Sequence, residues 1–163
     1  MESSEVFKLI ESNYPDALKS TDLEGTEQSV TIDANSIVDV CNYLKTESEL
    51  QFTSLMCLSG VDYEDKMEVV YHLHSLLHNH RVTLKVELSR EDPKLPTVTT
   101  VWKAADWHER EAYDMYGIVF DGHPDLRRIL LPDDWEGFPL RKDHVVAEEY
   151  RGWTIRKIKD GFE

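Results

Sequence analysis

The chain has 163 residues, of which 31% are charged, and its formal net charge is −14 at pH 7. Residues 1–126 carry 10 basic and 24 acidic side chains, whereas residues 127–163 carry 8 of each. This length is typical of one domain with a substantial core, and the acidic body argues against nucleic acid and anionic lipid as partners, while it is compatible with a basic protein partner.

The first part of the chain predicts helices and strands in alternation. Apolar residues at helical spacing predict a helix over residues 4–12. A weakly alternating stretch over 26–32 predicts a strand. Apolar residues that fall on one side at helical spacing predict a helix over 36–48, with Asn35 as its N-cap. A further strand is expected over 52–63.

The clearest strands are expected over residues 68–77 and 81–89. The second alternates apolar and polar residues throughout, and Asn79 lies in the turn that would join the two as a hairpin. A last strand is expected over 98–101. Together these elements predict an α+β fold, a two-layer domain with a mostly antiparallel sheet and helices on one face, followed by an extended irregular C-terminal segment.

A helix over residues 104–116 would complete the body, because Gly117 stands where a C′ glycine ends a helix. Helical spacing places Glu111 on the apolar face, between Trp107 and Met115. A carboxylate there needs a cation or several donors, and it is either a salt-bridged residue that fixes the following loop or a titrating functional group. The nearest cations in the sequence are Arg127 and Arg128. The opposite side of the helix would carry Glu109, Arg110 and Asp114.

We expect an α+β body over residues 1–116, and a docking segment with a tail over 117–163 that belongs to the same domain. The segment has little periodicity, but its aliphatic and aromatic content argues against disorder. An ordered irregular segment must find partners for its backbone groups, and some of these can lie on another chain. Tyr150 and Trp153 in the tail are residue types that anchor interfaces, so we expect a partner to order it.

Two groups of side chains are candidates for chemistry. The first is a set of four histidines that could bind a metal or, as we prefer, occupy polar edge and turn positions: His72, His74, His78 and His80. The second would be an acid–base or metal site of a free-standing enzyme, built on His123, Asp125 and Glu111. The chain has no GxSxG, GxxxxGK[ST] or GxGxxG motif. We therefore interpret Arg127 and Arg128 as partners of carboxylates, within the chain or across an interface.

Cysteine content and hydropathy further restrict the classes of protein and of metal site to which the chain could belong. Cys41 and Cys57 have no zinc spacing around them and cannot ligate an iron–sulfur cluster alone, which usually needs four thiolates. They are expected to be reduced thiols of a cytosolic protein. The N-terminal sequence shows no signal-peptide pattern, and no apolar stretch is long enough to span a membrane.

The charged helix and the loop after it resemble the C subunit of respiratory complex I, the small hydrophilic subunit of proton-translocating NADH–quinone oxidoreductase. The matching positions are Glu109, Arg110, Glu111, Asp114, Met115, Tyr116, Gly117 and Ile118, followed by GHPDLRRILLPDDW and PLRKD. The resemblance is dense over residues 97–143 and weaker over 66–90. It departs from the family at Tyr116, where Phe is common, and at His144-Val145, where an aromatic residue and Pro usually follow.

The resemblance implies a non-catalytic subunit of the peripheral arm, at the cytoplasmic side of the inner membrane. Its partners would be subunits D and B, which form the quinone pocket, and also the ferredoxin-like subunit. It implies no cofactor or metal in this chain, and FMN, iron–sulfur clusters and quinone in the complex. The residues expected to form the interface or fix its loop are Glu109, Arg110, Glu111, Asp114, His123, Asp125, Arg127, Arg128, Trp135, Arg141, Lys142, Asp143 and Trp153.

A related module occurs in membrane-bound hydrogenases and in ferredoxin–quinone complexes. An equivalent subunit of such a complex is therefore the alternative within this class, and it differs in the electron donor. The free-standing enzyme remains the alternative from another class.

Overall fold

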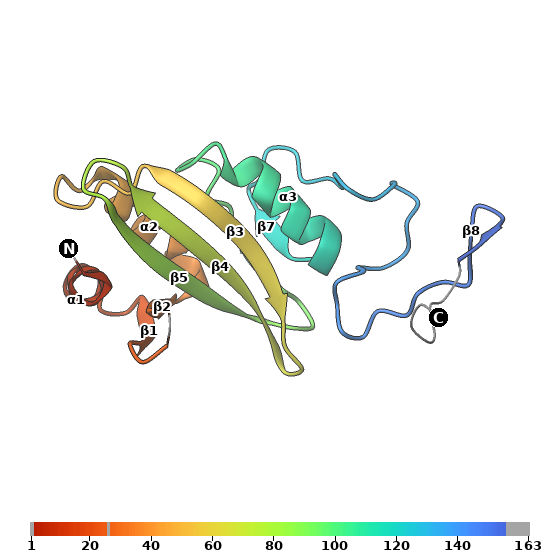
Figure 1. The fold of residues 1–163 in the computed structure, drawn as a ribbon, viewed down its shortest axis with the longest axis horizontal. Coiled ribbons are helices and arrows are strands. Elements are labelled where there is room, and N and C mark those ends of the chain that lie inside the picture. Colours follow the sequence, from red (N-terminus) through yellow and green to blue (C-terminus); the bar gives the residue numbers. More distant parts are fainter. Residues whose placement is uncertain (1, 26, 156–163) are drawn as a thin grey trace, which may run out of the picture.

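A five-stranded mixed sheet forms the centre of the computed structural model, which describes residues 2–25 and 27–155 (Figure 1). The strand order is β1-β2-β5-β4-β3, and every neighbouring pair is antiparallel except β2 with β5. The mostly antiparallel sheet expected from the sequence is confirmed. Its strands are β1 (Leu18–Asp22), β2 (Ser29–Ile32), β3 (Ser54–Asp62), β4 (Lys66–Ser75) and β5 (His80–Ser89).

Two amphipathic helices cover one face of this sheet, α1 (Ser3–Asn13) and α2 (Ile37–Thr46). Both were expected from apolar spacing. The N-cap predicted at Asn35 is wrong, because a 3₁₀ turn, η1 (Ala34–Ser36), precedes α2. Asp33 caps this turn by accepting a hydrogen bond from the backbone N–H of Asn35.

The β4–β5 hairpin follows the sequence prediction closely. Its turn includes Asn79, whose φ of 51° is the left-handed conformation that asparagine tolerates. The strand predicted over 98–101 is wrong, because the carbonyl of Val98 accepts hydrogen bonds from two later backbone N–H groups and the chain turns there. Two short strands, β6 (Lys94–Pro96) before this region and β7 (Val119–Asp121) after it in the sequence, pair with each other in parallel.

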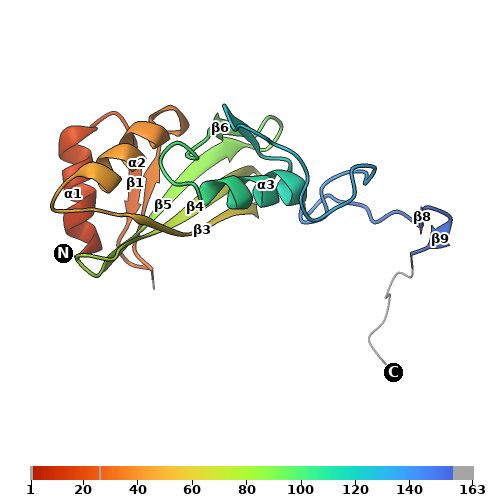
Figure 2. The same ribbon diagram turned by 90° about the horizontal axis from the view of Figure 1, so that it is seen from above.

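A third helix, α3 (Ala105–Tyr116), packs along β3 at the edge of the sheet (Figures 1 and 2). A close backbone approach at Gly60 in β3 allows this packing, because a Cβ atom there would lie 2.7 Å from the ring of Tyr116. The buried residues of the helices and the sheet form one hydrophobic cluster. No helix in the described part of the chain is long and apolar enough to cross a membrane.

After β7 the chain leaves the body as an irregular segment, and its described part closes with a small hairpin remote from the sheet (Figure 2). The hairpin consists of β8 (Glu149–Tyr150) and β9 (Trp153–Thr154). The extended irregular C-terminal segment expected from the sequence is therefore present as far as residue 155. The last part of the predicted tail, residues 156–163, lies outside the described residues.

Candidate functional site

The buried side of α3 differs from the one predicted. Glu111 is exposed and Trp107 keeps 62% of its surface accessible, so the apolar face assigned to them is wrong. The charged residues assigned to the solvent side are buried instead: Glu109, Arg110 and Asp114. The physical reason is that hydrogen bonds, and not only apolar contacts, decide which side of this helix is covered: Arg110 and Asp114 bond to the irregular segment, and Glu109 bonds to residues 97–98 before the helix.

Asp114 holds the irregular segment through its backbone. One carboxylate oxygen accepts hydrogen bonds from three successive N–H groups, those of Ile129, Leu130 and Leu131, at 3.0, 2.7 and 2.9 Å. The other oxygen accepts from Nη1 of Arg128 at 2.7 Å. Burial raises the pKa of Asp114, but the hydrogen bonds from these donors lower it by more than burial raises it. The net pKa therefore lies below the ordinary value of an aspartate. The side chain is therefore a buried anion with a full set of donors.

Arg128 extends this contact to the next loop. Its Nη2 donates to the backbone carbonyls of Trp135 and Gly137 at 3.2 and 3.1 Å. Its guanidinium also lies over the ring of Phe138, at 5.4 Å from the centroid. One arginine thus joins the end of α3 to two later points of the irregular segment.

Arg110 contacts the same segment from one turn earlier on α3. Its Nε donates to the carbonyl of Arg127 at 3.2 Å, and its Nη2 to that of Arg128 at 3.4 Å. The guanidinium lies 5.3 Å from the ring centroid of the exposed Trp107. Arg110 and Asp114 together bind both the carbonyl and the N–H groups of the segment, which lacks a strand partner there.

Glu109 makes a third set of contacts, which joins α3 to residues 97–98 and lies near His123. Its carboxylate accepts hydrogen bonds from the hydroxyl of Thr97 and from the N–H of Val98, the latter at 2.8 Å. Nε2 of His123 lies 3.9 Å from Glu109 Oε2 and 3.2 Å from Asp106 Oδ1. Since His123 Nδ1 accepts from a backbone N–H, the neutral imidazole carries its proton on Nε2, which faces the backbone carbonyl of Asp106 at 3.3 Å.

Burial raises the pKa of Glu109 to about 7, although hydrogen bonds from Thr97 and Val98 oppose it. A carboxyl whose pKa is higher in the folded than in the unfolded protein stabilises the fold below its ordinary pKa, and this stabilisation is lost as the pH rises through 7. We expect the free energy of unfolding to fall between pH 5 and pH 8 by up to about 3 kcal/mol more in the wild type than in Glu109→Gln. Urea denaturation at both pH values measures this, and identical pH dependence of the two proteins would contradict it.

The turn after α3 depends on glycine. Gly117 has a φ of 75°, and a Cβ atom there would lie 2.5 Å from the ring of Phe138. The same ring carries the guanidinium of Arg141 at 4.9 Å, and Arg141 Nε donates to the carbonyl of Tyr116 at 2.6 Å. The N–H of Leu140 donates to the carbonyl of Met115. The C-terminal end of α3 is thereby capped by residues 138–141.

We expect Gly117→Ala to lower the free energy of unfolding by about 1–3 kcal/mol more than Gly122→Ala. Both glycines have similar left-handed φ values, 75° and 82°, but a Cβ at position 122 would meet only Thr97 at an ordinary 3.5 Å. The difference between the variants, measured by urea denaturation, isolates the contact with Phe138. Equal losses would mean that Phe138 does not pack on Gly117 in solution.

A separate clamp holds the segment to the sheet. Asp62, at the end of β3, accepts two hydrogen bonds from Arg90 at 2.9 and 3.0 Å and one from the N–H of Lys142 at 2.7 Å. Arg90 also lies 3.3 Å from the carboxylate of Asp143. Burial raises the pKa of Asp62, but Arg90 and the N–H of Lys142 lower it to a net value below the ordinary one. Lys142 and Asp143 were predicted from the sequence, whereas Asp62 and Arg90 were not.

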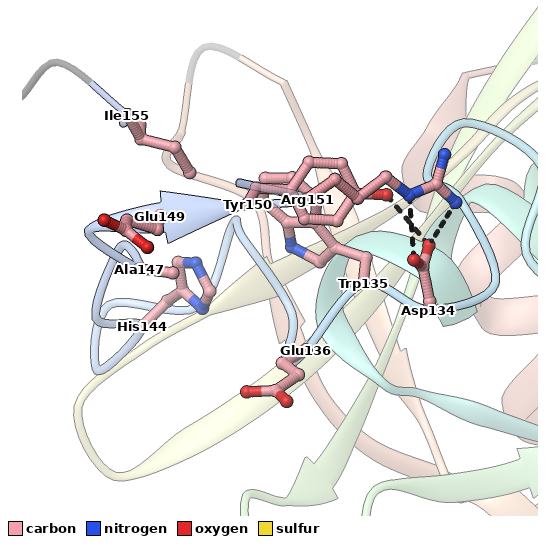
Figure 3. A pocket seen from close by; sticks show the side chains of 9 residues that line it. All are labelled: Asp134, Trp135, Glu136, His144, Ala147, Glu149, Tyr150, Arg151 and Ile155. Atoms are coloured by element: carbon pink, nitrogen blue, oxygen red, sulfur yellow. Dashed lines mark hydrogen bonds and ion pairs between the residues drawn. The ribbon is translucent and has the colours of Figure 1, made fainter. Parts of the chain in front are cut away.

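The last described part of the segment folds on itself. Asp134 accepts hydrogen bonds from Tyr150 and Arg151 at 2.8–2.9 Å, and the rings of Trp135 and Tyr150 have centroids 5.1 Å apart. These residues line a pocket of about 280 Å³ (Figure 3). Trp153, in the adjacent hairpin, is 79% exposed.

The residues suggested for a free-standing enzyme do not form one site. Asp125 pairs with Arg127 at the surface, at 2.8 Å, while the His123 side chain is fully buried and Glu111 points to solvent. Nor do the four histidines gather around a common point. Their ring nitrogens contact Glu27, Thr83, Asn79 and the carbonyls of Ser48 and Leu50, and the rings of His78 and His80 stack with centroids 5.5 Å apart. Within residues 2–25 and 27–155, no three His, Cys, Asp or Glu side chains form a group that could hold a metal ion.

Residues 30–150 match the family model of the respiratory-chain NADH dehydrogenase, 30 Kd subunit. Curated relatives are named as the C subunit of NADH-quinone oxidoreductase. The chain is 46% identical to that of Chloroherpeton thalassium over 152 residues, covering 91% of this chain but 63% of the relative. It is 45% identical to that of Chlorobium phaeobacteroides, covering 91% of this chain and 92% of the relative.

Two solved structures share the fold. The trypsin-resistant fragment of Nqo5 is 30% identical and has a TM-score of 0.56, covering 74% of this chain and 98% of the fragment. A chain of the archaeal membrane-bound sulfane sulfur reductase has a TM-score of 0.72 at 22% identity, covering 93% of this chain and 98% of that one, which is a likeness of fold alone. The family match over residues 30–150 and the 45% identity to a relative covered to 92% of its length establish that the chain belongs to the family of the respiratory-chain NADH dehydrogenase 30 Kd subunit.

Proposed function

We propose that the chain is a non-catalytic subunit in the peripheral arm of a proton-translocating NADH:quinone oxidoreductase. There it docks on and stabilises subunits D and B while electrons pass from NADH to quinone. The observation that carries this proposal is that charged residues of α3 hold the irregular segment in place. Arg110 and Asp114 bind the backbone of the irregular segment, so they present a fixed loop and do not form a substrate site.

The proposed docking surface is the segment over residues 117–163, of which 117–155 are described. Several large apolar side chains on it are exposed although hydrogen bonds hold its backbone in place. Such side chains on an ordered surface are typical of protein interfaces. They are Leu130, Leu140, Val145, Val146 and Trp153. Trp107 on α3 is also exposed and lies beside Arg110, which binds this segment, so we include it in the surface.

We assign FMN, the iron–sulfur clusters and quinone to other subunits of the complex. The two cysteines of this chain are too few for a cluster, and Cys41 is buried in the core, where burial raises the pKa of its thiol. Association with the cytoplasmic side of the inner membrane would come from the assembly, through subunits D and B and the ferredoxin-like subunit.

An equivalent role in a related membrane complex is the second candidate. It is favoured by the fold shared with the sulfane sulfur reductase chain, described as part of an archaeal respiratory membrane complex. Because one fold can serve complexes with different electron donors, this likeness does not choose between them. Relatives of higher sequence identity are named as subunits of NADH-quinone oxidoreductase, which favours NADH as the electron donor.

Purification of the tagged full-length chain from gently solubilised membranes tests the proposal. Mass spectrometry would identify the subunits that co-purify. We expect NADH-binding and cluster-bearing subunits together with subunits D and B. A hydrogenase or ferredoxin module in their place would support the second candidate. A chain recovered alone would contradict both.

A further inference from the structure

The buried carboxyl of Glu109 has no cation beside it. Its side chain is fully buried, and no lysine or arginine among residues 2–25 and 27–155 forms an ion pair with it. A buried anion without a cation is costly, so the carboxyl holds its proton firmly. Burial raises the pKa of Glu109 to about 7, and the charge of Asp106 on the same helix adds to this rise.

Two threonine hydroxyls give that proton a position and a route to solvent. Glu109 Oε1 accepts from the N–H of Val98 at 2.8 Å, so the proton belongs on Oε2, which contacts the hydroxyl of Thr97. The hydroxyl of Thr97 lies 2.9 Å from that of Thr99, which is half-buried. The two hydroxyls therefore form a chain from the buried carboxyl towards the surface.

His123 lies on the other side of the carboxyl. Its Nε2 is 3.9 Å from Glu109 Oε2, which is beyond hydrogen-bond distance, and donates to the backbone carbonyl of Asp106 at 3.3 Å. This separation suits a protonated acid, whose Oε2 directs its hydrogen at a hydroxyl and needs no second donor. His123 Nδ1 accepts from the N–H of Asp125 at 3.0 Å. One ring thus connects the surroundings of Glu109 to the turn at residues 123–125, near the beginning of the irregular segment.

We propose that the protonation state of Glu109 sets the position of the His123 ring and, through it, of the turn at residues 123–125. When the proton leaves to water through the two hydroxyls, the O–H bond of the carboxyl breaks and Oε2 becomes an additional acceptor. The Nε2–H of His123 then turns from the carbonyl of Asp106 to Oε2, and the ring draws the N–H of Asp125 with it. The imidazole stays neutral in this step. The inference goes beyond docking, because it makes the beginning of the segment sensitive to pH.

The other titratable groups around the cluster keep their charge near pH 7. Cys41 faces Glu109 from α2 and Tyr71 faces it from β4, and burial raises the pKa of both side chains, so both remain neutral. At the surface of the turn, the guanidinium of Arg127 lowers the pKa of Asp125, which remains an anion. Protonation of His123 itself is distinguishable, because it would place a hydrogen on Nδ1 and break the bond from Asp125.

Nitrogen NMR of the full-length chain between about pH 6 and pH 8.5 tests the coupling. We expect the amide of Asp125 and the ring nitrogens of His123 to shift with one common midpoint near pH 7. Through this transition Nδ1 should keep the signature of an unprotonated nitrogen. Glu109→Gln, which fixes a neutral side chain, should abolish the common transition. Glu111→Gln, exposed on the same helix, should retain it.

A second variant keeps the proposal testable if Glu109→Gln does not fold. Thr97→Val removes a hydroxyl that favours the carboxylate, so the common midpoint should rise by about 1 pH unit. A transition unchanged in either variant would overturn the proposal, and so would protonation of Nδ1 at the same midpoint, since His123 would then be the titrating group. An amide of Asp125 that stays fixed would overturn it as well. The measurement uses the free chain, so a failure of the proposed docking would leave its result unchanged.

Discussion

Asp114→Asn is expected to lower the free energy of unfolding by about 3–5 kcal/mol, because it leaves the guanidinium of Arg128 and three backbone N–H groups without their buried anion. The amide of asparagine is nearly isosteric, but it replaces one acceptor oxygen by a donor. The loss should be local as well as global. Hydrogen exchange at the amides of Ile129, Leu130 and Leu131 should become fast, and this is the most specific readout.

Glu111→Gln is the matched control for that experiment. It makes the same chemical change three residues earlier on α3, where the side chain is exposed, and should alter the stability by no more than about 0.5 kcal/mol. Since the pKa of Asp114 is lowered, its contribution is present at neutral pH and is lost as the pH falls through the folded-state pKa. Equal stability of the two variants would contradict the role assigned to Asp114.

Asp62→Asn is expected to cost about 2–4 kcal/mol and to release residues 141–143 from the sheet. The carboxylate is 1% exposed and binds both Arg90 and the N–H of Lys142. Lys142 lies 80 residues after Asp62 in the sequence. Trypsin cleaves after arginine and lysine, so cleavage after Arg141 and Lys142 should accelerate in the variant. A time course of limited trypsin digestion measures this directly.

The control for the clamp is Asp65→Asn, an exposed position between β3 and β4. It should leave both the stability and the cleavage rate at Arg141 and Lys142 at wild-type values. If Asp62→Asn and the control were cleaved alike, the segment would not depend on the clamp.

Local sequence patterns were sufficient for much of the body. The β4–β5 hairpin was predictable because β5 alternates buried and exposed residues along most of its length, and because Asn79 suits the left-handed turn. Strand β1 was missed for the opposite reason. Its residues are almost all exposed, so no apolar alternation marks it, and only pairing with β2 makes it a strand.

The candidate site was predictable in its residues but not in its geometry. The motif indicated that Glu109, Arg110 and Asp114 are important. The spacing of the apolar residues, however, predicted them on the solvent side of the helix and Glu111 on the buried side. Their burial depends on hydrogen bonds to backbone groups 11–17 residues away, which no helical period encodes. Asp62 and Arg90 lie still further from the segment they hold, so sequence spacing gives no signal for their role.

Hydrogen exchange of the full-length chain, measured free and in the purified complex, tests the central claim that the irregular segment is the docking surface. We expect amides within residues 122–155 to gain protection on assembly. Ile129, Leu130 and Leu131 should change least among them, because Asp114 already binds their N–H groups. The amides of α1 should not change. Protection confined to α1, α2 or the open face of the sheet, with none in the segment, would contradict the account and place the interface on the body.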